Sequence, residues 1–152
     1  MQKSQLIQSV CAEALNSNFC TNILESDPRS AFTTDVLTIY RVVLELALAH
    51  AQKSLVYAQH TFTSSAMPEI LEPLDKCVNR YSLTVHLLQS AFQEVKRGET
   101  MAAIYDSKLA GDSIQDCEQA FSVGKVNDVE VSKNNEIGWQ FVWIILSIQN
   151  FI

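Results

Sequence analysis

Four cysteines, Cys11, Cys20, Cys77 and Cys117, are the residues whose type and spacing most clearly indicate chemistry. The sequence has no Cys-x-x-Cys pair and no histidine at the spacing of a zinc ligand, so disulfide bonds fit these cysteines better than a metal site. Three pairings are possible. The simplest joins Cys11 to Cys20 as a local clip and Cys77 to Cys117 as a staple between two helices, with loops that would contribute roughly 3 and 4 kcal/mol. The alternative is four reduced, buried cysteines in a cytosolic protein.

The three histidines are the next candidates, because a histidine can ligate a metal or act as a general acid or base. His50, His60 and His86 form neither a His-Glu-x-x-His motif nor the Glu-x-x-His pairs of a di-iron helical bundle. We therefore interpret them as structural residues, with His60 at a solvated helix end and His50 and His86 at the edge of the core. No metal site is expected.

Acidic side chains crowd one predicted helix, at Asp106, Asp112, Asp116 and Glu118. Two of these carboxylates could do acid–base chemistry if one were buried, but a solvated acidic face is the simpler interpretation. The sequence contains no Gly-x-Ser-x-Gly motif, phosphate-binding loop or dinucleotide-binding glycine pattern. We therefore predict that the protein is not an enzyme, with no catalytic residue and no cofactor.

Length and composition narrow the class of protein. The chain has 152 residues, a formal net charge of -6, 4 glycines and 3 prolines, which favours one domain of long helices over many short strands. An acidic chain lacks the basic face that nucleic-acid binding needs. The apolar tail, residues 137–152, is shorter than a membrane-spanning helix and is interrupted by polar residues, so it is predicted to be a buried helix. The N-terminus lacks the apolar run of a secretory signal peptide.

Helical spacing and breaks divide the chain into a hairpin and a bundle. Two short helical patterns in residues 1–30 are separated by polar residues and would be held together by a Cys11–Cys20 bond. Longer amphipathic patterns follow within residues 32–65, 68–97 and 99–121, and a last one begins within 131–139 and runs to the end. We predict an all-α fold in which an N-terminal helical hairpin (1–30) precedes an up-and-down four-helix bundle (31–152), together forming a single domain of residues 1–152.

The predicted core follows from the same spacing. The clearest signal is a heptad-like seam that alternates steps of three and four residues: Leu71, Leu74, Val78, Tyr81, Val85, Leu88, Phe92 and Val95. The residues expected to face inward from the following helix are Met101, Ile104, Ile114, Cys117 and Phe121. Trp139 and Trp143 lie four residues apart on the last helix, so they share one side, where core packing is expected. A partly exposed tryptophan at a binding surface is the alternative.

Four stretches carry a family resemblance: the Cys11–Cys20 hairpin, LESDPRSA (Leu24–Ala31), CVNRY (Cys77–Tyr81) and DCEQAF (Asp116–Phe121). In this order and spacing, the chain resembles the plant invertase inhibitor and pectin methylesterase inhibitor family over nearly its whole length. The resemblance implies a clipped hairpin before a four-helix bundle, with disulfides Cys11–Cys20 and Cys77–Cys117. It also implies a secreted protein of the apoplast or cell wall whose signal peptide has been removed, and one that blocks the active-site cleft of its target enzyme as a rigid plug.

The resemblance also bears on the target. Invertase inhibitors of this family carry a Pro-Lys-Phe motif near the start of the third bundle helix, where this chain has Thr100, Met101 and Ala102. The stretches ESDPRSA and IYDS (Ile104–Ser107) are closer to the methylesterase side, although the Ser-Ala-Ala run common there is replaced by KLAGDSIQDC, and His86 stands where an aspartate is common. The resemblance thus favours a pectin methylesterase inhibitor. An invertase inhibitor and a divergent member with a new ligand or acquired catalysis are the alternatives.

The surface expected to bind the partner is the exposed side of the second and third bundle helices. The predicted contact residues are Asn79, Arg80, His86, Asp106 and Asp112. His86 is included because an imidazole gains charge in a mildly acidic medium such as the cell wall. The partner is expected to be pectin methylesterase or invertase, bound by a monomer, with no role for nucleic acid or a membrane.

Overall fold

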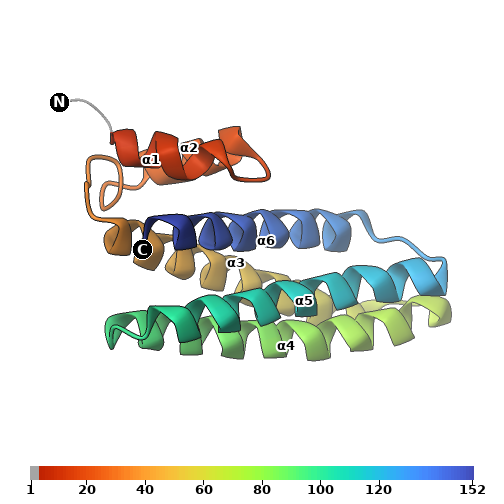
Figure 1. The fold of residues 1–152 in the computed structure, drawn as a ribbon. Helices are drawn as coiled ribbons and strands as arrows, with labels where there is room; N and C mark the ends of the chain where they lie inside the picture. Colours follow the sequence, from red (N-terminus) through yellow and green to blue (C-terminus); the bar gives the residue numbers. More distant parts are fainter. Residues whose placement is uncertain (1–3) are drawn as a thin grey trace.

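The structure, a computed structural model, describes residues 4–152 and is built from helices joined by short turns (Figure 1). Two short helices come first, α1 (Gln5–Ala12) and α2 (Ser17–Ser26). Four long helices follow: α3 (Val36–Ser64), α4 (Pro68–Lys96), α5 (Thr100–Gly124) and α6 (Val129–Ile148), with a terminal 3-10 turn, η1 (Gln149–Phe151). The described residues contain no strand, and the predicted all-α class is confirmed.

Helices α1 and α2 form the predicted hairpin. Short helices of 8 and 10 residues are marginal in water, and here each has a polar N-cap: Ser4 accepts a hydrogen bond from the Leu6 amide, and Asn16 accepts one from the Phe19 amide. The Cys11–Cys20 disulfide joins the two helices, as predicted, and both cysteines are buried. The hairpin is therefore stabilised by its caps, its clip and its buried face together.

Polar residues of the linker from α2 to α3 make hydrogen bonds that fix its conformation. Arg29 donates hydrogen bonds to the Asp27 carboxylate and to Glu45 on α3, and the bond from Arg29 lowers the pKa of Asp27. The buried Ser30 hydroxyl donates to the Leu24 carbonyl at 2.6 Å. Helix α3 then begins at Val36, after Asp35 caps the Leu37 amide at 3.1 Å. These polar residues thus determine where the hairpin ends and where the first helix of the bundle begins.

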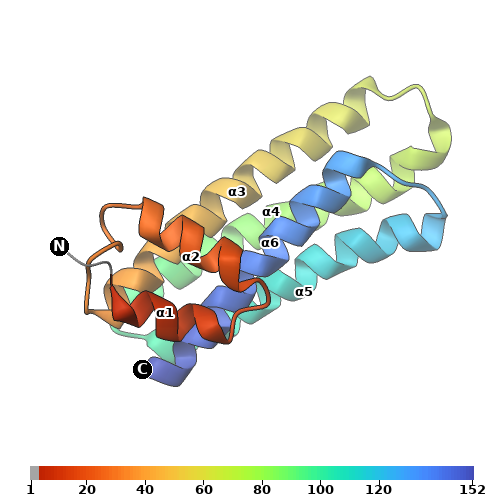
Figure 2. The ribbon, with the colours of Figure 1, turned by 90° about the horizontal axis from the view of Figure 1, so that it is seen from above.

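The long helices close a four-helix bundle in chain order. Helix α4 packs against α3 and α5, and α6 returns between α5 and α3 (Figures 1 and 2). The Cys77–Cys117 disulfide joins α4 to α5 inside the core. The hairpin covers only one end of the bundle, over α6 and the start of α3 (Figure 2), where the Phe19 ring meets the Phe141 ring edge-on at 5.2 Å. The predicted architecture and both disulfide pairings are confirmed.

The buried seam of α4 differs from the predicted one in half of its positions. Leu74, Tyr81, Leu88 and Val95 are buried, as expected. The alternate buried positions lie one place earlier than predicted: Ile70, Cys77, Thr84 and Ala91. Leu71, Val78, Val85 and Phe92 flank the seam and are half-buried. The spacing was correct, but the apolar side chains on the flank were mistaken for the centre of the buried face.

Three further sequence predictions need correction. Met101 does not point inward; its side chain is 71% exposed at the start of α5. Trp143 is 36% exposed and not fully packed in the core, although Trp139 is half-buried and meets it edge-on at 6.3 Å. Helix α6 begins at Val129, before the predicted range, because Asp128 caps the Val131 amide at 3.0 Å. No helix within residues 4–152 is both long enough and apolar enough to cross a membrane.

Candidate interaction surface on α4 and α5

The turn between α4 and α5 shapes one end of the candidate surface. Gly98 has φ +78°, a left-handed conformation that disfavours residues with a Cβ. The amide of Arg97 bonds to the carbonyls of Gln93 and Glu94, and the amide of Glu99 bonds to the Glu94 carbonyl at 2.8 Å, so these two carbonyls in the last turn of α4 are satisfied. Helix α4 ends at Lys96, within the predicted range of residues 68–97, and the tight turn brings α4 and α5 side by side.

A polar hollow of about 430 Å³ lies beside this turn. We call it the turn-end hollow; its lining residues are His86, Gln89, Ser90, Gln93, Glu94, Arg97 and Asp106. His86, predicted at the edge of the core, is instead exposed, and Asp106 is half-buried. The structure therefore brings two of the predicted contact residues, His86 and Asp106, into one open site.

Glu94 is the residue of this hollow that the sequence did not single out. A hydrogen bond with Asp106, followed by desolvation and by the negative charges of Asp106 and Glu99, raises the pKa of Glu94 to about 7, against a partly offsetting effect of Arg97. Its Oε1 atom is buried and has no hydrogen-bond partner among the described residues. No sequence pattern identifies this pair, because the two carboxyls come from different helices.

A second, larger depression runs between α4 and α5 toward the opposite end of the bundle. This loop-end groove has a volume of about 830 Å³ and includes Lys76, Asn79, Arg80 and Asp116 in its lining. The Arg80 Nε lies 3.4 Å from Asp116 Oδ2 but makes no well-aligned hydrogen bond, so the two groups form an ion pair only. Asn79 and Arg80, also predicted contacts, therefore share this groove. Asp112 is exposed but lines neither depression.

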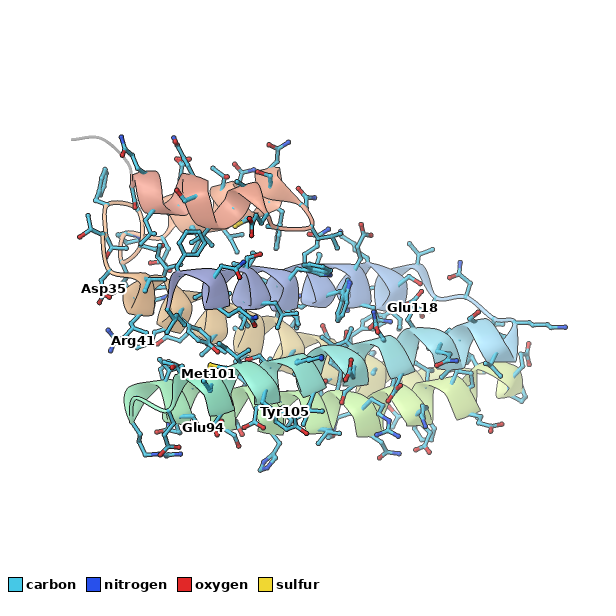
Figure 3. The ribbon with its side chains drawn as sticks, in the orientation of Figure 1. Asp35, Arg41, Glu94, Met101, Tyr105 and Glu118 are labelled. Carbon is cyan, nitrogen blue, oxygen red and sulfur yellow. A yellow bond between two sulfur atoms is a disulfide. The ribbon has the colours of Figure 1, made fainter. Side chains whose placement is uncertain are left out.

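Two large apolar side chains stand exposed on the same stretch of α5. Met101 and Tyr105 are 71% and 63% exposed, and being four residues apart they share one side of the helix (Figure 3). Sequence reasoning missed both, since it placed Met101 in the core and gave Tyr105 no role. The combination of exposed aromatic and thioether side chains with nearby charges is typical of protein-binding surfaces.

The interface of α5 with α6 contains a closed polar network. Tyr81 donates to Asn135 Oδ1 at 2.6 Å, and Asn135 Nδ2 donates to Glu118 Oε2 at 2.6 Å. Burial raises the pKa of Tyr81, so its hydroxyl stays protonated as the donor. These groups satisfy one another, which favours a structural role. No cluster of three or more metal-ligating side chains occurs within residues 4–152.

His50 has the structural role that the sequence predicted. Its Nε2 lies 2.8 Å from the carbonyl oxygen of Asn134, and its ring packs against Phe141. Because a carbonyl only accepts, the Nε2–H must be the donor. Desolvation by burial lowers the pKa of His50, so the neutral ring is favoured. His60 is exposed near the end of α3, as expected.

The fold and surface define a disulfide-stapled helical bundle with an open, polar face on α4 and α5. Comparison with known proteins then places the sequence: the chain belongs to the plant invertase/pectin methylesterase inhibitor family, whose sequence model matches residues 5–148. This is an inhibitor family, and the predicted resemblance is confirmed.

The family model matches nearly the whole chain, but the individual relatives share only about a quarter of its residues. Pectinesterase inhibitor 2 of Arabidopsis thaliana is 24% identical over 96% of this chain and 83% of that protein. The pectinesterase inhibitor of Actinidia deliciosa is 24% identical over 78% of this chain and 64% of that protein. A crystal structure of mutant form A of a pectin methylesterase inhibitor from Arabidopsis has a TM-score of 0.87 at 22% identity and covers 98% of both chains. Another pectin methylesterase inhibitor structure from Arabidopsis thaliana has a TM-score of 0.72, at 21% identity, covering 97% of this chain and 95% of that one.

Proposed function

We propose that this protein inhibits a pectin methylesterase by forming a one-to-one complex that blocks the active-site cleft of the enzyme. The family match supports an inhibitor, and both relatives described above are named pectinesterase inhibitors. The observation that carries the proposal is the α4–α5 pair, which is stapled by Cys77–Cys117 and carries two polar depressions and exposed apolar side chains.

The rigidity of this pair supports inhibition by contact. A surface that is already ordered in the free protein loses little conformational entropy when it binds, so more of the contact energy appears as affinity. The Cys77–Cys117 bond and the tight Gly98 turn both restrain α4 relative to α5. Binding residues on such helices keep their geometry, and the inhibitor needs no catalytic group of its own.

The proposed contact surface combines the predicted residues with those that the structure adds. Asn79 and Arg80 in the loop-end groove, and His86 and Asp106 in the turn-end hollow, supply the charged and polar contacts. Met101 and Tyr105 supply exposed apolar area on α5. Asp112 is exposed on the same helix and is retained as a contact residue. In this proposal, the protein acts as a monomer in the plant apoplast.

The direct test is titration of the purified, oxidised protein into plant pectin methylesterases of several isoforms, at acidic and neutral pH. We expect loss of esterase activity that reaches completion at one inhibitor per enzyme, with a stoichiometry of one by calorimetry. Parallel titrations against cell-wall and vacuolar invertases serve as the matched control. Inhibition of an invertase but of no esterase would reassign the target, and full esterase activity at micromolar inhibitor would overturn the proposal.

A further inference from the structure

A third depression lies between α5 and α6, outside the proposed contact surface. This α5–α6 groove has a volume of about 330 Å³, and its lining includes Ile114, Glu118, Asn135, Glu136 and Trp139. It shares no lining residue with the turn-end hollow or the loop-end groove. Its volume falls at the lower end of the range of about 300–1,000 Å³ that is usual for small-molecule sites. The proposed inhibition leaves this groove without a role.

The apolar part of the groove consists of a buried side chain and an aromatic ring that is held in place. Ile114 is buried, and Trp139 is half-buried. The Trp139 ring packs directly on the backbone of α5, since a Cβ added to Gly111 would lie 2.6 Å from Trp139 Cζ3. Trp143 meets this ring edge-on at 6.3 Å. An indole offers a large apolar surface and is the aromatic group that attracts cations best.

The polar part of the groove carries two carboxylates, one from each helix. Glu118 extends from α5 and is labelled in Figure 3, Glu136 extends from α6, and both are exposed. Asn135 Nδ2 donates to Glu118 Oε2 at 2.6 Å, and the Ser132 hydroxyl donates to Glu118 Oε1 at 3.3 Å. These bonds fix the orientation of the Glu118 carboxylate. They also leave it able to accept more, because an ionised carboxylate has roughly four acceptor positions.

No cation of the protein compensates these charges. Within residues 4–152, neither Glu118 nor Glu136 forms an ion pair. Lys133, the basic residue of α6, is exposed and lies three residues before Glu136 without pairing with it. The groove therefore combines negative charge with an aromatic ring in an acidic protein. The complementary ligand is a cation with an apolar body, and an anionic sugar would be repelled.

We propose that the α5–α6 groove binds a linear aliphatic diamine or polyamine. One ammonium group pairs with Glu118 and a second with Glu136, while the methylene chain lies against Ile114 and Trp139. Carboxylates on two helices favour a ligand with two cationic groups over one with a single charge. The apolar lining favours a methylene chain over a bare metal ion, which would also find fewer than three ligating side chains here. This site does not rest on the proposed function.

The first test uses intrinsic fluorescence. Trp139 lines the groove, Trp143 contacts it, and the sequence contains no other tryptophan, so the emission reports on this site alone. The full, oxidised chain is titrated with 1,4-diaminobutane and with spermidine at constant low ionic strength, because salt screens exposed charges. We expect a saturable change in emission with one ligand bound per chain. Mg²⁺ carries the same charge as 1,4-diaminobutane without its apolar body and should bind about tenfold more weakly. Equal affinity for Mg²⁺ would overturn the proposal.

A pair of variants separates the groove from the net charge of the protein. Glu136→Gln changes an exposed side chain that forms no ion pair within residues 4–152, so the fold should be unchanged while the affinity for 1,4-diaminobutane falls about fivefold. Glu130→Gln is the matched control, since Glu130 is exposed on the same helix and lines none of the three depressions. Equal weakening in both variants would show that binding follows net charge alone and would overturn the site.

The second test locates the ligand by NMR. We expect 1,4-diaminobutane to shift the Trp139 indole N–H and the Asn135 side-chain amide signals, and to leave the amides around the turn-end hollow unchanged. Shifts spread over the whole acidic surface would contradict a defined site. Two further probes are acetyl-lysine amide, which represents a basic side chain of a protein partner, and cellobiose, a neutral sugar. Tighter binding of either probe than of 1,4-diaminobutane would assign the groove to that other ligand and overturn the proposal.

Discussion

Tyr105 is the side chain that most clearly distinguishes the proposed contact surface at the scale of single residues. An aromatic ring that is 63% exposed on a rigid helix contributes nothing to the core. Tyrosine is enriched among the few interface residues that dominate binding energy, because it buries a large area at a small cost in side-chain entropy. Its neighbour Met101 adds polarizable apolar surface on the same side of α5.

Tyr105→Ala should weaken the proposed complex with pectin methylesterase while leaving the fold unchanged. A central aromatic contact is typically worth about 2 kcal/mol, or about 30-fold in the dissociation constant. The measurement is calorimetric or kinetic titration of the esterase, with thermal unfolding to confirm stability. Val56→Ala is the matched control, since Val56 is 62% exposed on α3 and lines neither depression. A dissociation constant within twofold of the native value would remove Tyr105 from the surface.

The sequence could locate only part of this site, for physical reasons that differ by residue. Asn79, Arg80 and Asp106 follow from polarity and the expected exposed face, and the structure places them in open depressions. Glu94 could not be found in this way, because its properties arise from a carboxyl on another helix and from one buried oxygen atom. Those depend on how α4 and α5 are aligned, which local spacing does not determine.

At the scale of elements, α5 shows why a buried face cannot be predicted from apolar residues alone. Its innermost residues repeat every three or four positions and several are small or polar: Ala103, Ser107, Ala110, Ile114, Cys117 and Phe121. At about 100° per residue, Met101 stands about 160° from Ala103, so it faces away from the bundle. Small residues let α4 approach closely, and the Thr84 hydroxyl reaches the Ala110 carbonyl at 3.4 Å. The number, order and approximate ends of the helices could be predicted from the apolar periodicity and the breaks in it. Which face of α5 is buried could not, because it depends on how closely α4 packs against the small residues of α5.

Gly111→Ala tests how closely α6 packs on α5. In an open helix this substitution would stabilise by roughly 0.5–1 kcal/mol. Here, an added Cβ would lie 2.6 Å from Trp139 Cζ3 and 2.9 Å from Val142 Cγ1, so overpacking should prevail, with a net loss of about 1–3 kcal/mol. Urea unfolding measures the change, with Ser122→Ala as a control at an exposed position of the same helix. A stabilised Gly111→Ala protein would show that α6 can move away from α5 without cost.

For the whole molecule, two groups at different places give the stability opposite pH dependences. At the turn end of α4, the raised pKa of Glu94, about 7 against a usual 4.5, gives a contribution that is fully present below about pH 4.5 and is lost as the pH rises through about 7. His50 lies between α3 and α6, where burial lowers its pKa and its ring donates to the Asn134 carbonyl. A folded state that holds His50 neutral binds fewer protons than the unfolded chain, so this contribution is present above about pH 6.5 and is lost as the pH falls through the lowered value.

These two contributions act in overlapping pH ranges with opposite signs, so in the native protein each should partly offset the other below about pH 6.5. Asp27, with its lowered pKa, is protonated only at lower pH, so it does not account for the part that favours higher pH. His50→Gln retains an amide donor but has no charge to gain, so its free energy of unfolding should fall more steeply between pH 5 and 7 than that of the native protein. Glu94→Gln removes the opposing contribution, so its free energy of unfolding should instead rise with pH in this range. Urea unfolding at half-unit steps from pH 4.5 to 8 measures both changes; a native pH profile in His50→Gln would assign the opposing contribution to another group.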